Sequence, residues 1–262
     1  MKRYLRIYKL LLSINLSDLM AYRAGFFGSF FGTTIWGVFH FISIFILTSR
    51  VNSVYGWSRS ELFILTATFS IMWGTFRMIF IKNFSQFSHT ILQGKLDGLL
   101  LKPLDSQFLM SVLKVNYVDV GRIVMGSVFM IYVIHTYHIT ITLWSIMLFS
   151  FLIIFSMFSA YALWFSVSTI IIWFPRLSNL IELLYTFAGI LRYPSDLMGG
   201  FGEFTVFFLA PILFILTTPV KTLIGRMSIP DIAWLIIFSL LFLLFSRLFW
   251  KHALKSYTSV SS

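Results

Sequence analysis

The sequence predicts an all-α polytopic membrane protein. Of the 262 residues, 58% are hydrophobic and 11% are charged, whereas a soluble domain carries about 25% charged residues. Several apolar runs reach the roughly 20 residues that an α-helix needs to cross about 30 Å of hydrocarbon. The 31 Phe, 8 Trp and 11 Tyr residues fit lipid-facing helices with aromatic side chains at the membrane interfaces.

Residues 1–20 are expected to form an amphipathic helix that lies in the plane of the lipid headgroups. Lys2, Arg6 and Lys9 recur at helical spacing, and apolar residues occupy other faces of the same helix. Charges run through this segment, and the first long apolar run lacks the short core and cleavage site of a signal peptide. The segment is therefore interpreted as an N-terminal interfacial helix.

Six transmembrane helices are expected in a single transmembrane domain, residues 1–262. Ser58 and Glu61 have the spacing of a capping box and should open the second helix. Phe174-Pro175-Arg176 should break the fourth, which is longer than a bilayer needs. Two short segments follow, of which one should cross the membrane and the other should enter and return; the sequence does not decide which. The expected order is spans 1–2 in residues 24–81, a cytoplasmic coupling loop in 82–116, spans 3–4 in 117–173, span 5 with a re-entrant segment in 177–219, and span 6 in 231–250.

The distribution of Lys and Arg predicts that both termini and the 82–116 loop are cytoplasmic. This bias indicates a multi-pass protein of the inner (cytoplasmic) membrane. It also attributes the net charge of +11 to loops that face anionic lipid, and no nucleic acid is expected as a partner. With the N-terminus inside, the inner set is Lys2, Arg3, Arg6, Lys9, Arg23, Lys82, Lys95, Lys102, Lys114, Arg122, Arg176, Arg247, Lys251 and Lys255, and the outer set is Arg50, Arg59, Arg192, Lys221 and Arg226.

The sequence shows no catalytic or metal-binding motif. It contains no G-x-x-x-x-G-K-[ST] phosphate-binding loop, no H-E-x-x-H pattern and no cysteine. His135 and His138 fit interfacial polar residues better than metal ligands, and His40 fits a hydrogen-bonded packing role. No enzymatic activity, cofactor or metal is therefore expected in this chain.

Carboxylates within the apolar segments are scarce. Glu182 is the main candidate, and a structural or gating role is favoured over contact with a substrate. Asp119 and Arg122, three residues apart on a helix, are expected to pair with each other. Because nothing here could harness an ion gradient, the energy for uphill transport would have to come from another polypeptide.

The loop segment ILQGKLDGLLLKPLDSQFLMSVL, residues 91–113, places charges among leucines. Gly94 and Gly98 should bracket a turn. A docking element for a soluble partner and an interfacial helix that contacts only lipid headgroups explain this segment equally well. Pro103 is expected to open a short helix whose apolar edge is formed by Leu104, Phe108 and Leu109.

The stretch GKLDGLLLKPLD resembles the cytoplasmic loop of ABC exporter permeases of the type-2 family, whose pattern is G-x-L-D-x-L-L-L-[RK]-P-L. A second stretch, RYPSDL, followed by the two prolines of APILFILTTP, is similar to the same subfamily. The similarity extends over nearly the whole chain. The matching residues are Gly94, Leu96, Asp97, Leu99, Leu100, Leu101, Lys102, Pro103 and Leu104 in the first pattern, and Arg192, Tyr193, Pro194, Pro211 and Pro219 in the second.

This resemblance implies the permease subunit of an ATP-driven exporter with six spans. The residues of the first pattern would form a coupling helix that fits a groove on a separate ATPase subunit. Two permease chains, identical or paralogous, would form the substrate pathway and dock on two ATPase subunits, which bind the ATP and Mg. The short helices before the last span would gate the outer exit. The residues of the second pattern are candidates for a gating or pathway role, as Glu182 is from its position in the sequence.

Two other classes compete with this interpretation. A stand-alone secondary transporter or channel for small amphiphiles would act without an ATPase. A membrane enzyme that acts on lipid would need clustered polar groups at the interface, and the sequence shows none beyond Asp97, Asp105 and the histidine pair. The transported substrate, and the choice between homodimer and heterodimer, stay open.

Overall fold

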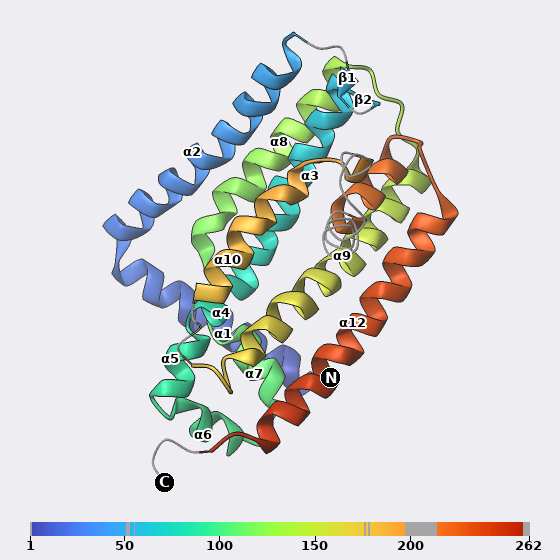
Figure 1. The fold of residues 1–262 in the computed structure, drawn as a ribbon. Coiled ribbons are helices and arrows are strands. Elements are labelled where there is room, and N and C mark those ends of the chain that lie inside the picture. Colours follow the sequence, from blue (N-terminus) through green and yellow to red (C-terminus); the bar gives the residue numbers. More distant parts are fainter. Residues whose placement is uncertain are drawn as a thin grey trace.

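In a computed structural model, the chain forms a bundle of α-helices (Figure 1). The structure describes residues 2–50, 53–54, 56–175, 177, 179–196 and 214–258. Within these ranges, five helical segments are long and apolar enough to cross a membrane. This finding confirms the all-α polytopic class. The five segments are Arg23–Thr48, Arg59–Leu92, Tyr117–Thr136, Leu143–Ile170 and Ile229–Lys255.

Shorter elements lie within and between these segments. Two-residue strands β1 (Ser53–Val54) and β2 (Trp57–Ser58) form an antiparallel hairpin. Residues 214–223 are helical as well. The helices are α1 (Lys2–Ala21), α2 (Arg23–Thr48), α3 (Arg59–Phe76), the π-helix η1 (Arg77–Ile81), α4 (Lys82–Ser85), α5 (Phe87–Leu92), α6 (Lys95–Leu100), α7 (Ser106–Val112), the 3₁₀ helix η2 (Tyr117–Asp119), α8 (Val120–Thr136), α9 (Leu143–Ile170), α10 (Asn179–Phe187), the 3₁₀ helix η3 (Ala188–Arg192) and α12 (Ile229–Lys255).

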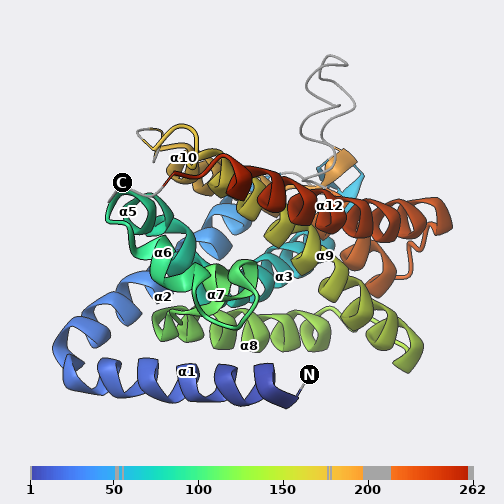
Figure 2. The same cartoon turned by 90° about the horizontal axis from the view of Figure 1, so that it is seen from below.

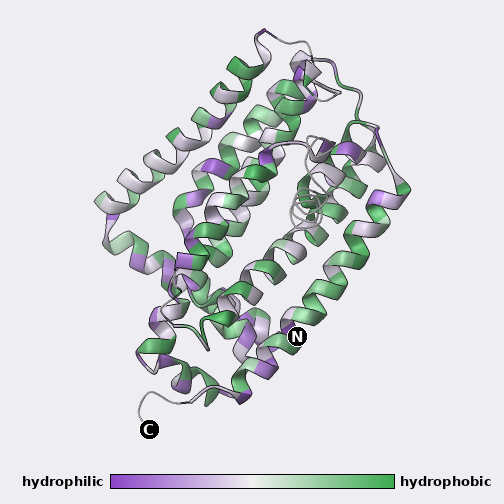
Figure 3. Cartoon of the chain, viewed as in Figure 1, coloured by the Kyte–Doolittle hydropathy of each residue, from purple (hydrophilic) through white to green (hydrophobic). Residues whose placement is uncertain are grey.

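The connecting elements gather at two opposite ends of the bundle (Figure 1). The terminal end, as we name it, carries α4–α7 and the last turns of α12. The hairpin end carries β1, β2 and the first turn of α12. Figure 3 shows hydrophobic residues along α9 and α12, and hydrophilic residues more often around α4–α7. A bilayer therefore fits between the two ends.

Helix α1 lies at the terminal end, at a steep angle to α2 (Figure 1), and it runs along the outside of the bundle in the view from below (Figure 2). None of its residues is buried. Asn15 Nδ2 donates to the Leu113 carbonyl oxygen at 3.1 Å, and the Tyr117 hydroxyl donates to the Leu12 carbonyl oxygen at 2.9 Å. These hydrogen bonds hold α1 against the segment that follows α7. The bounds of α1, Lys2–Ala21, nearly match the residues 1–20 that were expected to form the interfacial helix.

Helix α3 occupies the centre of the bundle and most of its side chains are buried. Its start confirms the predicted capping box, because Ser58 Oγ accepts from the Glu61 backbone N–H and Glu61 Oε2 accepts from the Ser58 N–H at 2.7 Å. A Cβ at Gly126 of α8 would lie 2.9 Å from Ser70 Cβ and 3.2 Å from the Ala67 carbonyl oxygen. The missing side chain therefore lets α8 approach α3 closely.

Helices α9 and α12 pack against each other through small polar residues. The hydroxyls of Ser159 and Ser239 lie 2.6 Å apart, and Ser239 Oγ donates to the Phe155 carbonyl oxygen at 3.0 Å. In a membrane, where lipid tails are as apolar as leucine, close packing of small residues and interhelical hydrogen bonds associate helices. Helices α9 and α12 are therefore closely packed and joined by hydrogen bonds.

The segment after Pro175 runs between the two ends of the bundle. At the terminal end, Ser88 Oγ of α5 donates to the Pro175 carbonyl oxygen at 2.9 Å. At the hairpin end, Trp57 Nε1 of β2 donates to Asp196 Oδ2 at 2.9 Å. Helices α10 and η3 form the path between these anchor points (Figure 1).

Residues 214–223 occupy the half of the bundle near the hairpin end. Ser156, midway along α9, donates to the Ile215 carbonyl oxygen. Thr217 Oγ1 accepts from the Ser195 N–H at 3.1 Å. Pro219 is buried in this helix, whereas Pro211, which was assigned a gating or pathway role, lies outside the described residues.

Candidate coupling surface

The predicted coupling motif forms a helical hairpin at the terminal end. Gly94 precedes α6 with φ of +65°, a left-handed conformation that glycine adopts without strain. Leu96 is fully buried and Leu99 is 8% exposed, so both anchor α6 to the bundle. Leu101, by contrast, is 86% exposed in the turn that follows α6.

The motif thus divides into a buried part and an exposed part. We call the exposed part the coupling knuckle, which consists of Leu100, Leu101, Lys102 and Pro103. Gly98 is also exposed, and a Cβ there would meet no atom within 4 Å. Asp97 and Leu104 are half-buried at the two sides of the knuckle. The knuckle therefore presents an exposed leucine pair next to Lys and Pro that the described part of the chain does not bury.

Helix α7 begins at Ser106, so the prediction that Pro103 opens it is wrong. Asp105 is the N-cap, and its Oδ1 accepts from the Phe108 N–H at 2.9 Å. An aspartate oxygen satisfies a free helix N–H group, which proline cannot do. The expected apolar edge is also different: Leu109 is buried and the Phe108 ring packs edge-on against Tyr4 of α1, with ring centroids 5.0 Å apart.

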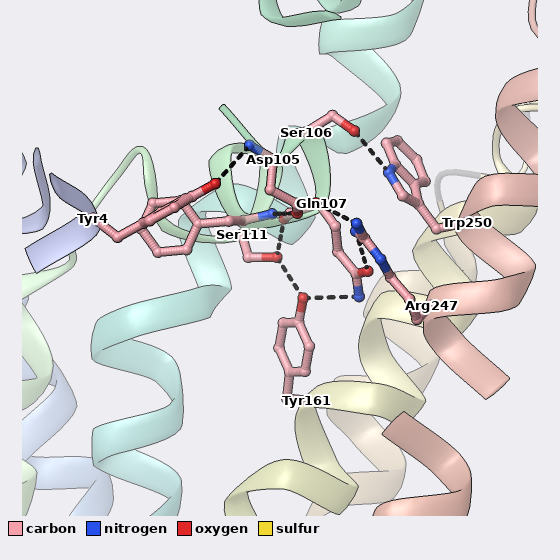
Figure 4. Close-up of polar contacts among 9 residues, drawn as sticks. Tyr4, Asp105, Ser106, Gln107, Ser111, Tyr161, Arg247 and Trp250 are labelled. Carbon is pink, nitrogen blue, oxygen red and sulfur yellow. Dashed lines mark hydrogen bonds and ion pairs between the residues drawn. The ribbon is translucent and has the colours of Figure 1, made fainter. Parts of the chain in front are cut away.

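The residues after the knuckle are held by α12 through charged and polar contacts (Figure 4). Arg247 forms an ion pair with Asp105, and its second terminal nitrogen donates to Gln107 Oε1 at 3.1 Å. Trp250 Nε1 donates to Ser106 Oγ at 3.0 Å. A forked guanidinium that bonds two neighbouring acceptors fixes orientation as well as distance.

Helix α9 joins the same cluster through Tyr161 (Figure 4). Its hydroxyl accepts from Gln107 Nε2 at 3.2 Å and lies 2.9 Å from the hydroxyl of Ser111. We name the whole set the clamp. The clamp joins the start of α7, next to the knuckle, to both α9 and α12. The clamp consists of Asp105, Ser106, Gln107, Ser111, Tyr161, Arg247 and Trp250.

Comparison with known proteins identifies the family. A family model described as ABC-2 family transporter protein matches residues 34–261, which is most of the 262 residues. The chain belongs to the ABC-2 transporter family. The resemblance stated from the sequence is confirmed, and the permease is a multi-pass membrane component of an ABC-type transporter. Neither the curated proteins nor the solved structures gave a match to the chain.

Most of the clamp had no predicted role in the sequence. Gln107, Tyr161 and Trp250 look like ordinary interfacial side chains when read along the chain. Arg247 gave a usable signal, since an arginine within an apolar final span needs an acceptor from elsewhere in the fold. The permease supplies that acceptor from Asp105, 142 residues away in sequence.

The π-helix η1 widens the second long helix of the permease at its terminal end. Wide π turns free backbone carbonyl groups, and such turns often occur at functional sites. Here the Met78 carbonyl oxygen accepts from the Asn116 N–H at 2.7 Å. The Ile79 carbonyl oxygen accepts from Asn83 Nδ2 at 3.0 Å. The segment before α8 therefore docks directly on η1.

Asp119 pairs with Arg77 of η1, which corrects the expected Asp119–Arg122 pair. Arg77 Nε donates to Asp119 Oδ1 at 2.9 Å, and Asn116 Nδ2 donates to Asp119 Oδ2 at 2.6 Å. No ion pair joins Asp119 to Arg122 in the described part of the chain. The partner 42 residues away takes the carboxylate because η1 and the start of α8 are packed together.

The predicted gating residues lie away from the knuckle. Arg192 ends η3, and its guanidinium carbon is 5.3 Å from the centre of the Tyr193 ring. Pro194 is buried beside them. Glu182 is exposed in the first turn of α10. Arg192, Tyr193 and Pro194 lie toward the hairpin end of the permease. The first sequence motif, around the knuckle, and the second, around Arg192, therefore occupy two separate sites.

A polar cluster lies near these residues at the hairpin end. We name it the latch, and it consists of Gly56, Trp57, Glu61, Asp196, Lys221 and Arg226. Asp196 accepts from Trp57 Nε1 and pairs with Lys221, whose Nζ lies 3.1 Å from the carboxylate. Arg226 pairs with Glu61 at 3.0 Å and donates to the Gly56 carbonyl oxygen at 2.9 Å. The latch ties β2, the segment that follows η3 and the 214–226 region to the start of α3.

The latch should weaken in acid. Burial acts to raise the pKa of Asp196, but the hydrogen bonds from Trp57 and Lys221 outweigh it, and the pKa lies below its usual value. A lowered pKa stabilises the fold above the unfolded-state value, and this contribution is lost as the pH falls through the folded-state value. We expect D196N to lower the melting temperature of the purified permease at pH 7, and the difference from wild type to shrink in the acid range.

Two variants provide the comparison for this measurement. K221Q removes the cation and should reduce the same pH-dependent difference. W57F keeps an aromatic ring but removes the Nε1 donor, and it should lower stability in the same direction. A D196N effect that stays constant from pH 7 down to pH 3 would show that the charge of Asp196 does not hold the latch.

Proposed function

We propose that this permease forms half of the membrane pathway of an ATP-driven exporter, and that the coupling knuckle binds a groove on a separate ATPase subunit. The observation that carries this proposal is the 86% exposure of Leu101 in a turn that the clamp joins to α9 and α12. An uncovered apolar side chain on a well-anchored support suits a protein interface. ATP and Mg would bind to the partner.

The permease is further proposed to cross the membrane six times. The path of α10 and η3 from the Pro175 anchor to the Asp196 anchor supports a fifth crossing there. Residues 214–223, confined to the hairpin half, fit the returning arm of a re-entrant segment. With α12 as the sixth crossing, both termini would lie on one side.

The terminal end is proposed to face the cytoplasm of a cell with an inner membrane. The described elements there carry most of the cations, including four on α1. The hairpin end carries Arg50, Arg59, Lys221 and Arg226. An excess of Lys and Arg in short loops marks the cytoplasmic side. This orientation points the knuckle toward a soluble ATPase.

Two permease chains, identical or paralogous, and two ATPase subunits would complete the exporter. Each chain offers one knuckle, so each would engage one ATPase. Closure of the ATPases on ATP would displace the knuckles and, through the clamp, the α9–α12 pair. The latch at the opposite end would then open or close the exit.

The test is purification of the tagged permease from membranes of its source cell. We expect an ATPase to co-purify, and 8-azido-ATP to label that subunit and not the permease. Liposomes that contain the complex should hydrolyse ATP in a vanadate-sensitive manner, whereas liposomes with the permease alone should not. ATP-independent solute uptake by the permease alone, reduced in E182Q, would instead support a stand-alone carrier.

A further inference from the structure

Helix α1, helix α7 and the π-helix η1 line an apolar cavity at the terminal end. Its volume is about 490 Å³, within the roughly 300–1,000 Å³ of ligand pockets. Leu5 of α1 is 59% exposed, whereas Val112 of α7 is buried. The cavity therefore opens at the surface and reaches the buried side of α7. The lining residues are Tyr4, Leu5, Tyr8, Ile79, Phe108 and Val112.

Two sets of contacts fix α1 over this cavity, at two places along the helix. Near its start, the Tyr4 hydroxyl accepts from the Asp105 N–H at 3.3 Å, and Figure 4 shows this bond beside the clamp. The Tyr4 ring also packs on Phe108, with ring centroids 5.0 Å apart. Further along, α1 makes the hydrogen bonds of Leu12 and Asn15 described above. The wall that α1 contributes is therefore held in a defined position.

The cations of α1 are arranged around the face that lines the cavity. At about 3.6 residues per turn, the three cavity-lining residues of α1 share one face of the helix. Lys2 and Lys9 lie on one flank of that face, and Arg3 and Arg6 lie on the opposite side; all four side chains are exposed. Asp18, the one acidic residue of α1, lies near the other end of the helix. The rim of the cavity therefore carries positive charge that no neighbouring carboxylate of α1 offsets.

A phospholipid with a negatively charged headgroup fits this combination of an apolar cavity and a basic rim. Apolar cavities bind apolar groups in preference to water, and cations at a membrane surface attract anionic headgroups. A second copy of the chain fits less well, because the four cations of one α1 would repel those of the other. A small soluble anion would leave the apolar lining uncovered. The headgroup and the acyl chain of one lipid satisfy both parts of the site.

We propose that one anionic phospholipid, from the leaflet at the terminal end, binds between α1 and α7. Its acyl chain lies in the cavity against Leu5 and Val112, and its phosphate lies near Lys2 and Lys9 on the flank of α1. Lysine suits this position, since its apolar stem covers the rim while its ammonium group reaches the headgroup. Because Tyr4 lines the cavity and accepts from the N–H of a clamp residue, the lipid also holds α1 beside the clamp. Binding requires no ATPase, so this site and the proposed exporter can fail independently.

The test counts the lipids bound to the purified permease by native mass spectrometry in a neutral detergent. The probes are dioleoyl phosphatidylglycerol, zwitterionic dioleoyl phosphatidylcholine, and glycerol phosphate, which has the charge but no acyl chain. We expect the first phosphatidylglycerol to bind about tenfold more tightly than the first phosphatidylcholine, and glycerol phosphate not to bind. A phosphatidylglycerol with a photoreactive group in its acyl chain should label peptides of α1, η1 or α7, and labelling elsewhere would reject the site.

Matched leucine variants of α1 test the position of the acyl chain. L5D places a carboxylate in the cavity lining, whereas L10D places it on the opposite face of α1, at a leucine that is 60% exposed. We expect L5D to weaken phosphatidylglycerol binding about tenfold and L10D to weaken it much less. Because both leucines are exposed, the fold should tolerate both changes, and equal melting temperatures without lipid check this. Should either carboxylate variant fail to fold, L5N and L10N give the same comparison.

Matched double variants of α1 test the position of the headgroup. K2Q/K9Q removes the two cations that flank the cavity, and R3Q/R6Q removes two from the far side of the helix. Both change the net charge equally, so general attraction to anionic lipid predicts equal effects. We expect K2Q/K9Q to weaken phosphatidylglycerol binding about tenfold and R3Q/R6Q to weaken it much less. Equal affinities of the two double variants, or of L5D and L10D, would overturn the proposal, and phosphatidylcholine binding as tight as that of phosphatidylglycerol would reject an anionic ligand.

Discussion

Replacing Leu101 with Asp should separate the permease from its ATPase while leaving the permease inserted in the membrane. The side chain is 86% exposed and makes no contribution to the core, so the fold should tolerate the change. In the complex, a carboxylate would replace the apolar contact at the centre of the proposed interface. Loss of such a contact costs about 2 kcal/mol or more of binding free energy, which raises the dissociation constant of the permease–ATPase complex about 30-fold. The measurement is recovery of ATPase with the tagged permease.

Two further positions show whether this loss is specific. L92D introduces the same charge at a leucine of α5 that is 54% exposed but lies outside the knuckle, and it should retain the ATPase. L96D places a charge at a fully buried position and should reduce the yield of folded permease. If L101D recovers as much ATPase as L92D, the knuckle is not the docking element.

The long helices could be predicted from the sequence because one physical requirement determines them. Hydrocarbon demands apolar side chains and satisfied backbone groups over a fixed thickness. The predicted start of spans 1–2 at residue 24 and the start of the observed α2, Arg23–Thr48, therefore nearly coincide. The capping box at Ser58 was equally accessible, since both of its hydrogen bonds are local.

The candidate site was only partly predictable, because its decisive contacts are distant in sequence. Local spacing suggested Arg122 as the partner of Asp119, but the fold brings Arg77 closer. Pro103 and Asp105 are both valid helix-start signals, and only the capping hydrogen bond decides between them. The motif itself gave no indication that Leu96 is buried and Leu101 exposed, since this depends on how α6 packs on the bundle.

Replacing Arg247 with Gln should uncouple the exporter without detaching the ATPase. The knuckle would be unchanged, but Asp105 and Gln107 would lose their link to α12. Because the chain has no cysteine, cysteines introduced at Ser53 and Ile229 can be spin-labelled selectively at the hairpin end. We expect ATP to change the distance between these labels in the wild-type complex, as measured by double electron–electron resonance. In R247Q, ATP hydrolysis should continue while this distance change is lost.

The chemistry of Asp105 distinguishes coupling from simple loss of a helix cap. D105N keeps an oxygen that can accept from the Phe108 N–H but removes the charge that Arg247 needs. It should therefore resemble R247Q. D105A removes the cap as well and should lower the melting temperature of the permease further. W250F, which loses only the hydrogen bond to Ser106, should reduce the ATP-dependent distance change partially. If D105N and R247Q both keep the full response to ATP, the force reaches α12 by a route other than the clamp. The hydrogen bonds of Tyr161 on α9 with Gln107 and Ser111 would then be the next contact to remove by mutation.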